Sequence, residues 1–497
     1  MKTSLNSLYY FLAVAVIVFI ITAFNSHGYY HGDEHYQIIE FAGIKLGTHA
    51  PDDLAWEFKT KIRPTLQPTI AFLSIKSLES LGVSDPYNQA FFLRLLTTLL
   101  ALICISFFIK KTEQIFKENW QKRLYYFLSY FLWFIPFLSV RFSSEIWSGL
   151  FFLVSIGLCQ SKTYKSSTPF LIGLAFGLSF LFRFQLGICI AVALLWLLLI
   201  KKLPLRSLLK VGVGFTLLLV LSIFIDSWFY NELVFTPWSY LKIQLLEGAA
   251  AGFGTSPWHF YLEKIFTYPS LFIGIPLVLS IIIVSIKHPK SIFLWSTLSF
   301  LIVHSAIAHK EERFMFPIAF LFPIILSLGI MYIYSFAKRT YITKRLIQVI
   351  GVLLLFVNVI GITVLASKTA GLGRMAISKY IHENYADQSV NLISTDWSNP
   401  YNPWQSLPTK FYLERDLESR GISNLCGYND SLIDDNKVNL LVMRKIDLDD
   451  ENCNKVIQSE KFELIQQSVP PWIQKINKIY RGLDERNIFL LYKKTEN

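Results

Sequence analysis

Residues 8–24 of the chain read LYYFLAVAVIVFIITAF, an apolar run without a charged side chain. An α-helix rises about 1.5 Å per residue, so roughly 20 apolar residues cross the hydrocarbon core of a bilayer. The run follows Lys2 and contains no small-residue cleavage site, which favours a retained membrane span over a removed signal peptide. We therefore expect the fold to begin with a membrane helix.

Similar apolar runs recur as far as residue 367 and predict a mainly α, polytopic membrane protein with about eleven transmembrane helices. The runs are 8–24, 89–109, 124–140, 145–160, 169–182, 184–200, 207–229, 265–286, 291–307, 313–336 and 346–366. Arg183 separates two short runs. Residues 169–200 therefore form either two spans, one long tilted helix or a re-entrant pair.

The composition excludes an ordinary soluble enzyme. The 497 residues are 53% hydrophobic and 16% charged, whereas soluble domains carry about 25% charged residues. The net charge is +12, but residues 1–367 hold 30 basic and 17 acidic side chains, and residues 368–497 hold 17 and 18. Because the basic excess lies in the apolar part, it indicates membrane topology and contact with lipids rather than a nucleic-acid partner.

The distribution of the positive charge predicts the orientation. With a cytoplasmic N-terminus, every second loop is cytoplasmic, and these loops with Lys2 contain 18 basic residues against the acidic pair Glu113 and Glu118. Positive charge marks the cytoplasmic side. Eleven spans then place the first loop (25–88), the loop at 230–264 and the C-terminal region (368–497) on the non-cytoplasmic side.

The C-terminal region predicts a small α/β domain after a transmembrane catalytic domain at residues 1–367. Short β-type runs occur at 390–395, 438–443, 462–466 and 488–493, separated by helix-compatible stretches. Cys426 and Cys453 are the only cysteines outside the apolar runs. They form either a disulfide, in an oxidising compartment, or two separate thiols.

Titratable side chains gather on the predicted non-cytoplasmic side, first in the stretch HGYYHGDEHYQIIEFA at 27–42. There the carboxylates of Asp33 and Glu34 lie between His31 and His35. Asp33 is either a helix N-cap, a ligand of a metal site with His31 and His35, or a general base that accepts a proton from a substrate hydroxyl. We expect no metal at this site, because no second cluster with metal-ligand spacing occurs in the sequence.

Further polar residues on this side are candidates for substrate binding. They are His31, Arg63, Arg141, Glu145, Arg183, Gln185, Trp258, His259, His309, Lys310, Glu311 and Arg313. A single arginine at a membrane edge is explained by snorkelling or topology alone. Several together favour a site for an anionic, lipid-linked substrate, because a guanidinium makes paired, charge-assisted hydrogen bonds to phosphate.

Four of these segments resemble the lipid-phosphate-mannose-dependent mannosyltransferases of glycosyltransferase family 22. The segments are HGDEHYQ (31–37), WEFKTKIRP (56–64), GTSPWHFY (254–261) and HKEERFMFP (309–317). They occur in the order found in that family, and the third resembles the branch that adds the third mannose of GPI anchors. Gly32 departs from the proline of many relatives. We assign no motif of the family to residues 368–497, so the role of this region stays open.

The resemblance implies a C-type glycosyltransferase fold and inverting transfer of mannose. The donor is a polyprenyl- or dolichyl-phosphate mannose, and the acceptor is a hydroxyl of a glycan or glycolipid. Asp33 becomes the catalytic base and Glu34 its neighbour, and cations at Arg63, Arg183, His309, Lys310 and Arg313 face the leaving phosphate. No cofactor is implied, although a divalent metal stays open. The host membrane is a bacterial inner membrane or the endoplasmic reticulum.

Three alternatives stay open on the sequence. The first is a glycosyltransferase of the same fold that uses a different hexose. The second is a transporter or flippase for a lipid-linked glycan, which inverted repeats would favour, and we detect none. The third is a structural membrane protein, in which the carboxylates of the first loop are dispensable.

Overall fold

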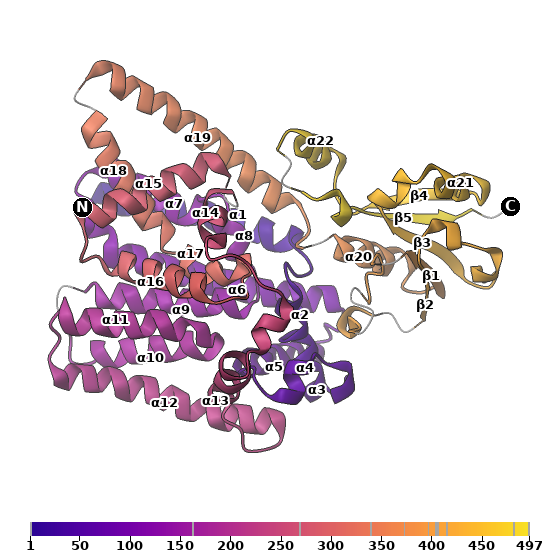
Figure 1. Cartoon of the computed structure of the whole chain (residues 1–497), viewed down its shortest axis with the longest axis horizontal. Coiled ribbons are helices and arrows are strands. Elements are labelled where there is room, and N and C mark those ends of the chain that lie inside the picture. Colours follow the sequence, from indigo (N-terminus) through magenta and orange to yellow (C-terminus); the bar gives the residue numbers. More distant parts are fainter. Residues whose placement is uncertain are drawn as a thin grey trace. The chain divides into compact units, whose positions relative to one another are not determined.

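A computed structural model describes residues 2–161, 164–267, 270–337, 340–371, 373–395, 397–402, 407–413, 416–480 and 483–495. The chain divides into two compact units (Figure 1). The helical unit contains Met1–Ala23, Thr60–Ile70 and Arg94–Ala366, and the sheet unit contains Phe24–Lys59, Ala71–Leu93 and Ser367–Asn497. Residues 25–59 and 71–88 of the first loop therefore belong to the same unit as the C-terminal region, whereas Thr60–Ile70 belongs to the helical unit.

Each predicted apolar run corresponds to helix. The helices of these runs are α1 (Lys2–Asn25), α6 (Pro86–Thr112), α7 (Asn119–Phe131), α8 (Ile135–Leu138), α9 (Ser144–Cys159), α10 (Thr168–Phe182), α11 (Gly187–Leu199), α12 (Leu205–Tyr230), α15 (Leu271–Lys287), α16 (Ile292–Ala306), α17 (Phe316–Ala319), α18 (Phe322–Ala337) and α19 (Tyr341–Ser367). Two further helices, α13 (Thr236–Tyr240) and α14 (Phe260–Thr267), lie in the loop before α15.

The lengths of these helices make the chain a multi-pass membrane protein. In the described residues, four helices are long and apolar enough to cross a membrane, or five if the bent pair α17 and α18 is one span. Others are apolar but shorter, at 10–17 residues. Residues 169–200, for which the sequence left one helix or two open, form two helices, α10 and α11, with the 3-10 turn Phe184–Leu186 between them. The number of spans stays a prediction.

One break in the helices shows how the backbone is satisfied in an apolar setting. Helix α7 ends at Phe131, and α8 begins at Ile135. The Asn358 amide nitrogen, on α19, donates to the carbonyl of Phe131 at 2.6 Å, and its oxygen accepts the amide N–H of Trp133 at 2.9 Å. Since lipid provides no hydrogen bonds, a buried side chain takes over the backbone groups that the break exposes.

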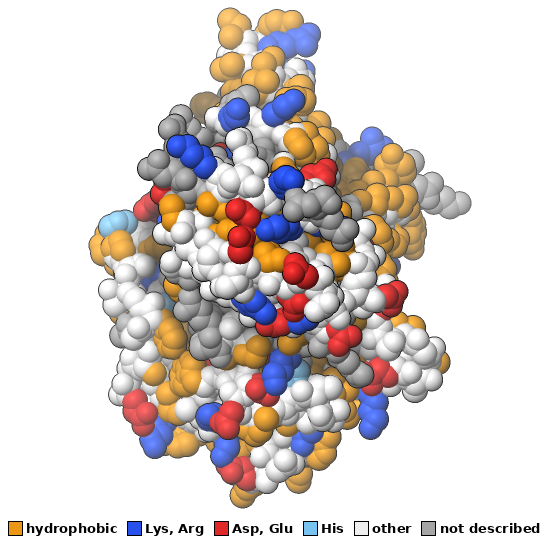
Figure 2. Space-filling view, turned by 90° about the vertical axis from the view of Figure 1, so that its right-hand side faces the viewer, with side chains coloured by type: hydrophobic (Ala, Val, Ile, Leu, Met, Phe, Trp, Pro, Cys, Tyr) orange, Lys and Arg blue, Asp and Glu red, His pale blue; other side chains and the backbone are white. Residues whose placement is uncertain are grey.

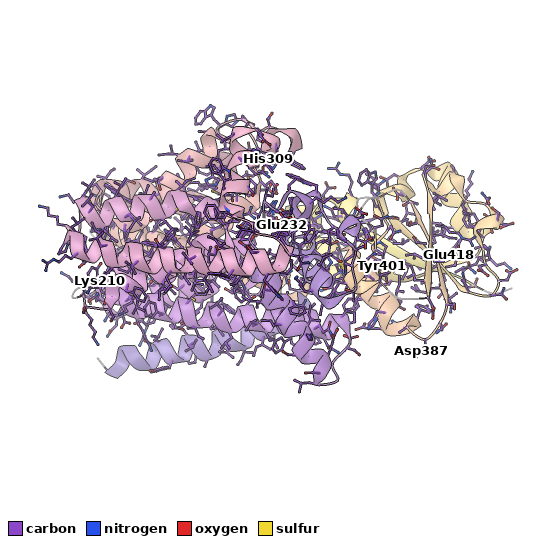
Figure 3. The ribbon with its side chains drawn as sticks, turned by 90° about the horizontal axis from the view of Figure 1, so that it is seen from below. Lys210, Glu232, His309, Asp387, Tyr401 and Glu418 are labelled. Atoms are coloured by element: carbon purple, nitrogen blue, oxygen red, sulfur yellow. The ribbon has the colours of Figure 1, made fainter. Side chains whose placement is uncertain are left out.

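Loop contacts within the helical unit follow the predicted sides. The Lys201 ammonium donates to the carbonyl of Ser161, and the Lys210 ammonium donates to Ser166, so two loops predicted as cytoplasmic meet. At the opposite end, Ser256 N–H donates to the carbonyl of Ala308. Figure 3 shows Lys210 at one end of α12 and Glu232 at the other, with His309 towards the end of Glu232.

The sheet unit contains a five-stranded mixed sheet in the order β2-β1-β3-β5-β4. The strands are β1 (Val390–Thr395), β2 (Leu417–Ile422), β3 (Val438–Arg444), β4 (Phe462–Gln467) and β5 (Phe489–Lys494). Strand β1 is parallel to β2 and β3, and β5 is antiparallel to β3 and β4. This confirms the small α/β arrangement, and β2 is a strand that the sequence did not predict.

Helices cover the sheet of the C-terminal region. Ile377 and Ile381 of α20 (Arg374–Tyr385) pack on Leu392, Leu440 and Leu491 from three strands. Helix α21 (Glu451–Ser459) lies beside β4, and α22 (Pro471–Tyr480) follows β4 in the chain (Figure 1). Acidic and basic side chains are interspersed over the face drawn in Figure 2, as is typical of a surface in water.

The first loop folds into short helices. They are α2 (Gly32–Tyr36), α3 (Ile39–Leu46), α4 (Trp56–Thr60) and α5 (Leu66–Ser80).

Cys426 takes part in a disulfide, and the thiols of Cys104, Cys159 and Cys189 are free and buried. The side chain of Cys453 lies outside the described part of the structure, so the pairing of Cys426 with Cys453 stays a prediction.

Glycines allow α10 and α12 to approach closely. A Cβ atom added at Gly214 would lie 2.4 Å from the carbonyl oxygen of Phe170, and one at Gly173 would lie 2.1 Å from that of Val211. Gly212, two residues before Gly214 on the same helix, has no atom within 4 Å of an added Cβ. Small residues at such a contact are the usual means of close helix packing in membranes.

We predict opposite effects of the two alanine substitutions on α12. Gly214→Ala forces the helices apart and lowers the free energy of unfolding by about 1–3 kcal/mol. Gly212→Ala replaces a glycine inside the helix at a position with free space. We expect it to raise the free energy of unfolding by about 0.5–1 kcal/mol. Thermal unfolding of both variants in the same detergent measures the difference. Equal midpoints would show that α10 and α12 do not pack through Gly214.

Candidate active site

The candidate residues fall into two groups, one in each unit. The sheet unit holds His31, Asp33 and Glu34 on and before α2. The helical unit holds the remaining candidates, which are Arg63, Arg141, Glu145, Arg183, Gln185, Trp258, His259, His309, Lys310, Glu311 and Arg313.

Helix α2 presents Asp33 on its first turn. The N-cap residue is His31, whose Nδ1 accepts the backbone N–H of Asp33 at 3.3 Å. The capping role that Asp33 was a candidate for is therefore filled by a histidine. The carboxylate of Asp33 lies 3.8 Å from the same ring nitrogen, and its side chain is 23% exposed. Asp33 thus keeps a carboxylate at the surface of the first loop.

Glu34 is oriented differently from Asp33. Glu34 is only 9% exposed, and its Oε2 accepts a hydrogen bond from the backbone N–H of Tyr30 at 2.9 Å. The two adjacent carboxylates therefore do different things. Glu34 fixes the chain that enters α2, while Asp33 reaches the surface.

A buried carboxylate that the sequence analysis missed lies directly behind α2. Glu40, on α3, is 1% exposed. Its oxygens pair with Nε2 of His35 at 2.6 Å and with Nε2 of His49. Burial raises the pKa of Glu40, but the charges and hydrogen bonds of His35 and His49 outweigh burial and hold the pKa below its ordinary value. The signal available was an acidic residue within the apolar run IIEFA.

Metal binding was one interpretation of the first-loop histidines. Within the described residues, no group of three His, Cys, Asp or Glu side chains is arranged to hold a metal ion. His35 faces Glu40, whereas the His31 ring lies beside Asp33. The two histidines thus have different carboxylate partners.

In the helical unit, Glu145 is the centre of the polar cluster. It lies on the first turn of α9 and is 3% exposed. Its Oε1 forms an ion pair with Nη1 of Arg183 at 3.0 Å and accepts a hydrogen bond from Nη1 of Arg313 at 3.1 Å. Both guanidinium groups also lie 5.4 Å from the Phe314 ring centroid. One carboxylate therefore faces two buried cations.

Arg63 adds a third positive charge to this neighbourhood. Its segment is held at the end of α12, where the Tyr230 hydroxyl donates to the Arg63 carbonyl at 2.9 Å and Asp226 accepts from Thr65. Burial lowers the pKa of the Arg183 guanidinium, Glu145 opposes this, and the charges of Arg313 and Arg63 add to it. Arginine remains protonated in proteins despite such shifts.

The segments GTSPWHFY and HKEERFMFP are joined in space. The His309 Nδ1 pairs with the carbonyl of Gly254, and the Lys310 ammonium donates to the carbonyl of Ser256 at 2.9 Å. Glu311 binds both Nε2 of His309 at 2.9 Å and Nε of Arg313 at 2.5 Å. The structure thus links two motifs that lie about 50 residues apart to the cluster around Glu145.

The remaining candidates lie at various distances from this centre. The Gln185 oxygen accepts from Nε of Arg183 at 3.0 Å. Arg141 is buried with its guanidinium over the Phe137 ring. Trp258 is 67% exposed and packs edge-on against His259. An exposed tryptophan in such a loop is typical of the membrane interface. Trp258 therefore lies on the surface and is not part of the cluster around Glu145, although it was predicted from the sequence as a site residue.

Comparison with known proteins agrees with this arrangement. Residues 9–414 match the model of the Alg9-like mannosyltransferase family. The chain belongs to this family. Membership makes the protein a glycosyltransferase by class and confirms the family resemblance of the four motifs.

Relatives within the Alg9-like family come from several eukaryotes. GPI mannosyltransferase 3 of Candida albicans is 25% identical over 362 residues, which cover 71% of this chain and 68% of the relative. Mannosyltransferase APTG1 of Arabidopsis thaliana is 26% identical over 321 residues, covering 60% and 54%. The match thus covers about two thirds of the length of the Candida protein and about half of the length of the Arabidopsis protein.

A solved structure supports the fold. The crystal structure of ArnT from Cupriavidus metallidurans, bound to undecaprenyl phosphate, aligns with a TM-score of 0.52 at 11% identity and covers 98% of both chains. At this identity the likeness concerns the fold alone. The C-type glycosyltransferase fold predicted from the motifs is confirmed.

The shared carboxylate makes a clear prediction. Glu145→Gln removes the carboxylate that two buried guanidiniums share and breaks both ion pairs, so we expect it to lower the free energy of unfolding by about 3–5 kcal/mol. The matched control is Glu247→Gln, because Glu247 pairs with Lys242 at 3.7 Å on the surface. This control changes the free energy by about 0.5 kcal/mol or less. Unfolding followed by intrinsic fluorescence compares the two, and similar midpoints would refute the central role of Glu145.

Proposed function

We propose that this protein transfers mannose from a polyprenyl- or dolichyl-phosphate mannose to a hydroxyl group of a glycan or glycolipid, with inversion at the anomeric carbon. The observation that carries the proposal is the pairing of Arg183 and Arg313 with the buried carboxylate of Glu145, with Arg63 near enough to Arg183 to lower its pKa. Such a cluster has more positive than negative charge, which suits a phosphate group.

The charge count supports an anionic substrate. Glu145 offsets one of the two guanidiniums that it binds, and Glu311 divides its hydrogen bonds between Arg313 and His309. A phosphate that enters the cluster meets several fixed cations, and guanidinium groups bind phosphate through charge-assisted hydrogen bonds. As the bond from anomeric carbon to phosphate oxygen breaks, the negative charge of the phosphate grows and the fixed cations stabilise it.

Asp33 supplies the base in this proposal. Its carboxylate reaches the surface of the first loop. It takes the proton of the acceptor hydroxyl while the hydroxyl oxygen attacks the anomeric carbon and the lipid phosphate leaves. Glu34 is its neighbour and holds the incoming chain through Tyr30. We assign the other candidates to substrate binding, namely His31, Arg141, Gln185, Trp258, His259, Lys310 and Glu311.

Names of the relatives support the choice of sugar and carrier. The Xenopus laevis relative is a GPI alpha-1,2-mannosyltransferase 3, and the Schizosaccharomyces pombe relative is a probable Dol-P-Man:Man(7)GlcNAc(2)-PP-Dol alpha-1,6-mannosyltransferase. Both names specify mannose, and the second specifies its dolichyl-phosphate carrier. We propose the same donor class for this chain and leave the acceptor at the level of a glycan or glycolipid.

We further propose that the transfer takes place on the non-cytoplasmic face. Residues 1–367 then form the transmembrane catalytic domain and residues 368–497 a non-cytoplasmic α/β domain. The positive-inside distribution supports this orientation, as do loop contacts that join segments predicted on the same side.

Labelling of single cysteines tests the orientation. Asn429→Cys lies on the surface of the C-terminal region, and Lys117→Cys lies on the surface of a predicted cytoplasmic loop. In intact cells or sealed, right-side-out vesicles, we expect a membrane-impermeant maleimide to label Asn429→Cys directly and Lys117→Cys only after permeabilisation. The native thiols of the spans are buried. The reverse pattern would invert the proposed topology.

Substitution of Asp33 tests the chemistry. We expect Asp33→Asn to lower kcat for mannosyl transfer by about 10²–10⁴-fold, since the amide cannot accept the proton. The assay supplies polyprenyl-phosphate mannose and a mannose-terminated glycolipid to purified protein. The control is Asp52→Asn, which makes the same change at a 90% exposed side chain paired with Lys59 in the same loop, and we expect its kcat to match the wild type.

Other results of this assay would decide against the proposal. Wild-type transfer by Asp33→Asn removes the residue from the base role. Transfer from a different lipid-phosphate hexose, with none from mannose, would replace the sugar. If the wild type transfers no sugar but moves a fluorescent lipid-linked glycan across vesicle membranes, the protein is a transporter.

A further inference from the structure

Four consecutive residues of the C-terminal region, Thr409, Lys410, Phe411 and Tyr412, each contact the first loop within the sheet unit. They lie between β1 and β2, and the last three form the short 3-10 helix Lys410–Tyr412. Their partners are about 370 residues away in the sequence. We call this segment, Thr409–Tyr412, the latch.

The hydroxyl of Thr409 bonds the phenol of Tyr36, the last residue of α2, at 2.7 Å. Thr409 is 1% exposed. The Tyr29 ring meets the Tyr36 ring edge-on, with the centroids 6.1 Å apart and the planes at 70°. Burial raises the pKa of both phenols, so both stay protonated and available as donors. Thr409 is thus the point where the C-terminal region meets the helix that carries Asp33.

The other latch residues hold the support behind α2. The backbone N–H of Phe411 donates to Oε1 of Glu40 at 3.3 Å, and Glu40 in turn holds His35. The ring of Tyr412 stacks on His35 with centroids 5.4 Å apart and planes at 17°. Tyr29 covers the ring at 4.9 Å and 21°. His35 is therefore clamped from both faces and at its edge.

Lys410 completes the set with an ion pair to Asp53 at 2.6 Å. Nearby, His382 of α20 pairs with Asp85 at 2.5 Å, and Met375 packs with Tyr87 and Tyr412 in one buried cluster. The first loop is thus fixed to the C-terminal region by bonds that converge on residues 35, 36 and 40. Asp33 lies two residues before the nearest of these.

We propose that the latch is a positioning element for Asp33. By fixing His35 and Tyr36, it holds the five-residue helix α2 in the one arrangement that aims the carboxylate at the acceptor hydroxyl. This inference rests on the proposed base role of Asp33. A helix of five residues has no stability of its own, so its geometry comes from such contacts. Thr409 therefore acts through Tyr36, and it does not itself touch the reacting atoms.

The matched pair Thr409→Val and Thr409→Ser tests the latch. Valine keeps the shape and removes the hydroxyl, whereas serine keeps the hydroxyl. We expect Thr409→Val to lower kcat for mannosyl transfer about tenfold with the donor KM within about twofold, because small displacements of a reacting group reduce rate more than binding. We expect Thr409→Ser to restore most of the wild-type kcat. Tyr36→Phe removes the other partner, and combined with Thr409→Val it should add nothing further.

Hydrogen exchange gives a readout that does not need activity. We expect the backbone amides of α2 to exchange faster in Thr409→Val than in Thr409→Ser or the wild type. Leu440→Ala serves as the control for simple destabilisation, since Leu440 lies in the core of the sheet. It should lower the yield of folded protein while kcat per folded molecule stays at the wild-type value.

The outcomes separate the inference from the proposed function. A folded Thr409→Val protein with wild-type kcat and unchanged exchange in α2 overturns the latch and leaves the base role of Asp33 intact. A loss of kcat in Leu440→Ala equal to that in Thr409→Val also overturns it, because stability alone then explains the effect. If Thr409→Val does not fold, Tyr36→Phe carries the same test. An inactive wild type removes the proposed function, whereas exchange in α2 still decides whether the latch holds the loop.

Discussion

A bilayer provides no hydrogen-bonding partner, so every polar group at membrane depth must find its partner within the chain. This constraint explains several separate features of the helical unit. The side chain of Asn358 takes over the backbone groups at the break between α7 and α8. Glu145 pairs with two guanidiniums at the start of α9. At these two places, a side chain from another part of the helical unit satisfies the break or the charge.

The same constraint gives basic residues two different roles. Lysines such as Lys117 are exposed to water, and their charge acts on orientation alone. Arg183 and Arg313 are buried and both pair with Glu145, and Arg313 also pairs with Glu311. Buried charges of this kind are kept where groups of opposite sign face them. In the proposed function, these fixed cations are the groups that contact the phosphate of the donor.

Patterns in the sequence predicted the features that depend on local composition. The apolar runs gave the helices, and four strands followed from short β-type runs. Strand β2 was missed because LESRGI carries charge and lies at the edge of the sheet, with several side chains exposed. Its only paired neighbour is β1, so no buried apolar alternation marks it. Their positions at the edges of predicted spans marked Glu145 and Arg183 only as residues on one side of the membrane, since which carboxylate binds which arginine depends on packing.

The first loop shows where such prediction ends. Asp33 stands out because two carboxylates and two histidines occur together in HGDEH. Glu40 and His49 do not stand out, and Thr409 is an ordinary threonine outside the four motifs. Their importance comes from contacts over about 370 residues of sequence, which composition and periodicity do not record.

Helix α2 is too short to keep its own shape, so a carboxylate carried on it can be accurate only if something larger holds the helix. The helix ends in two residues, His35 and Tyr36, that are bound on several sides by the sheet unit. The C-terminal region, of which residues 368–414 lie within the family match and residues 415–497 lie beyond it, is therefore tied to the helix that carries the proposed base. Its strands can vary as long as they keep a folded sheet, whereas the residues of the latch must keep the groups that hold α2. We expect sequence constraint in this region to concentrate in those few positions, because only they connect the sheet to the chemistry.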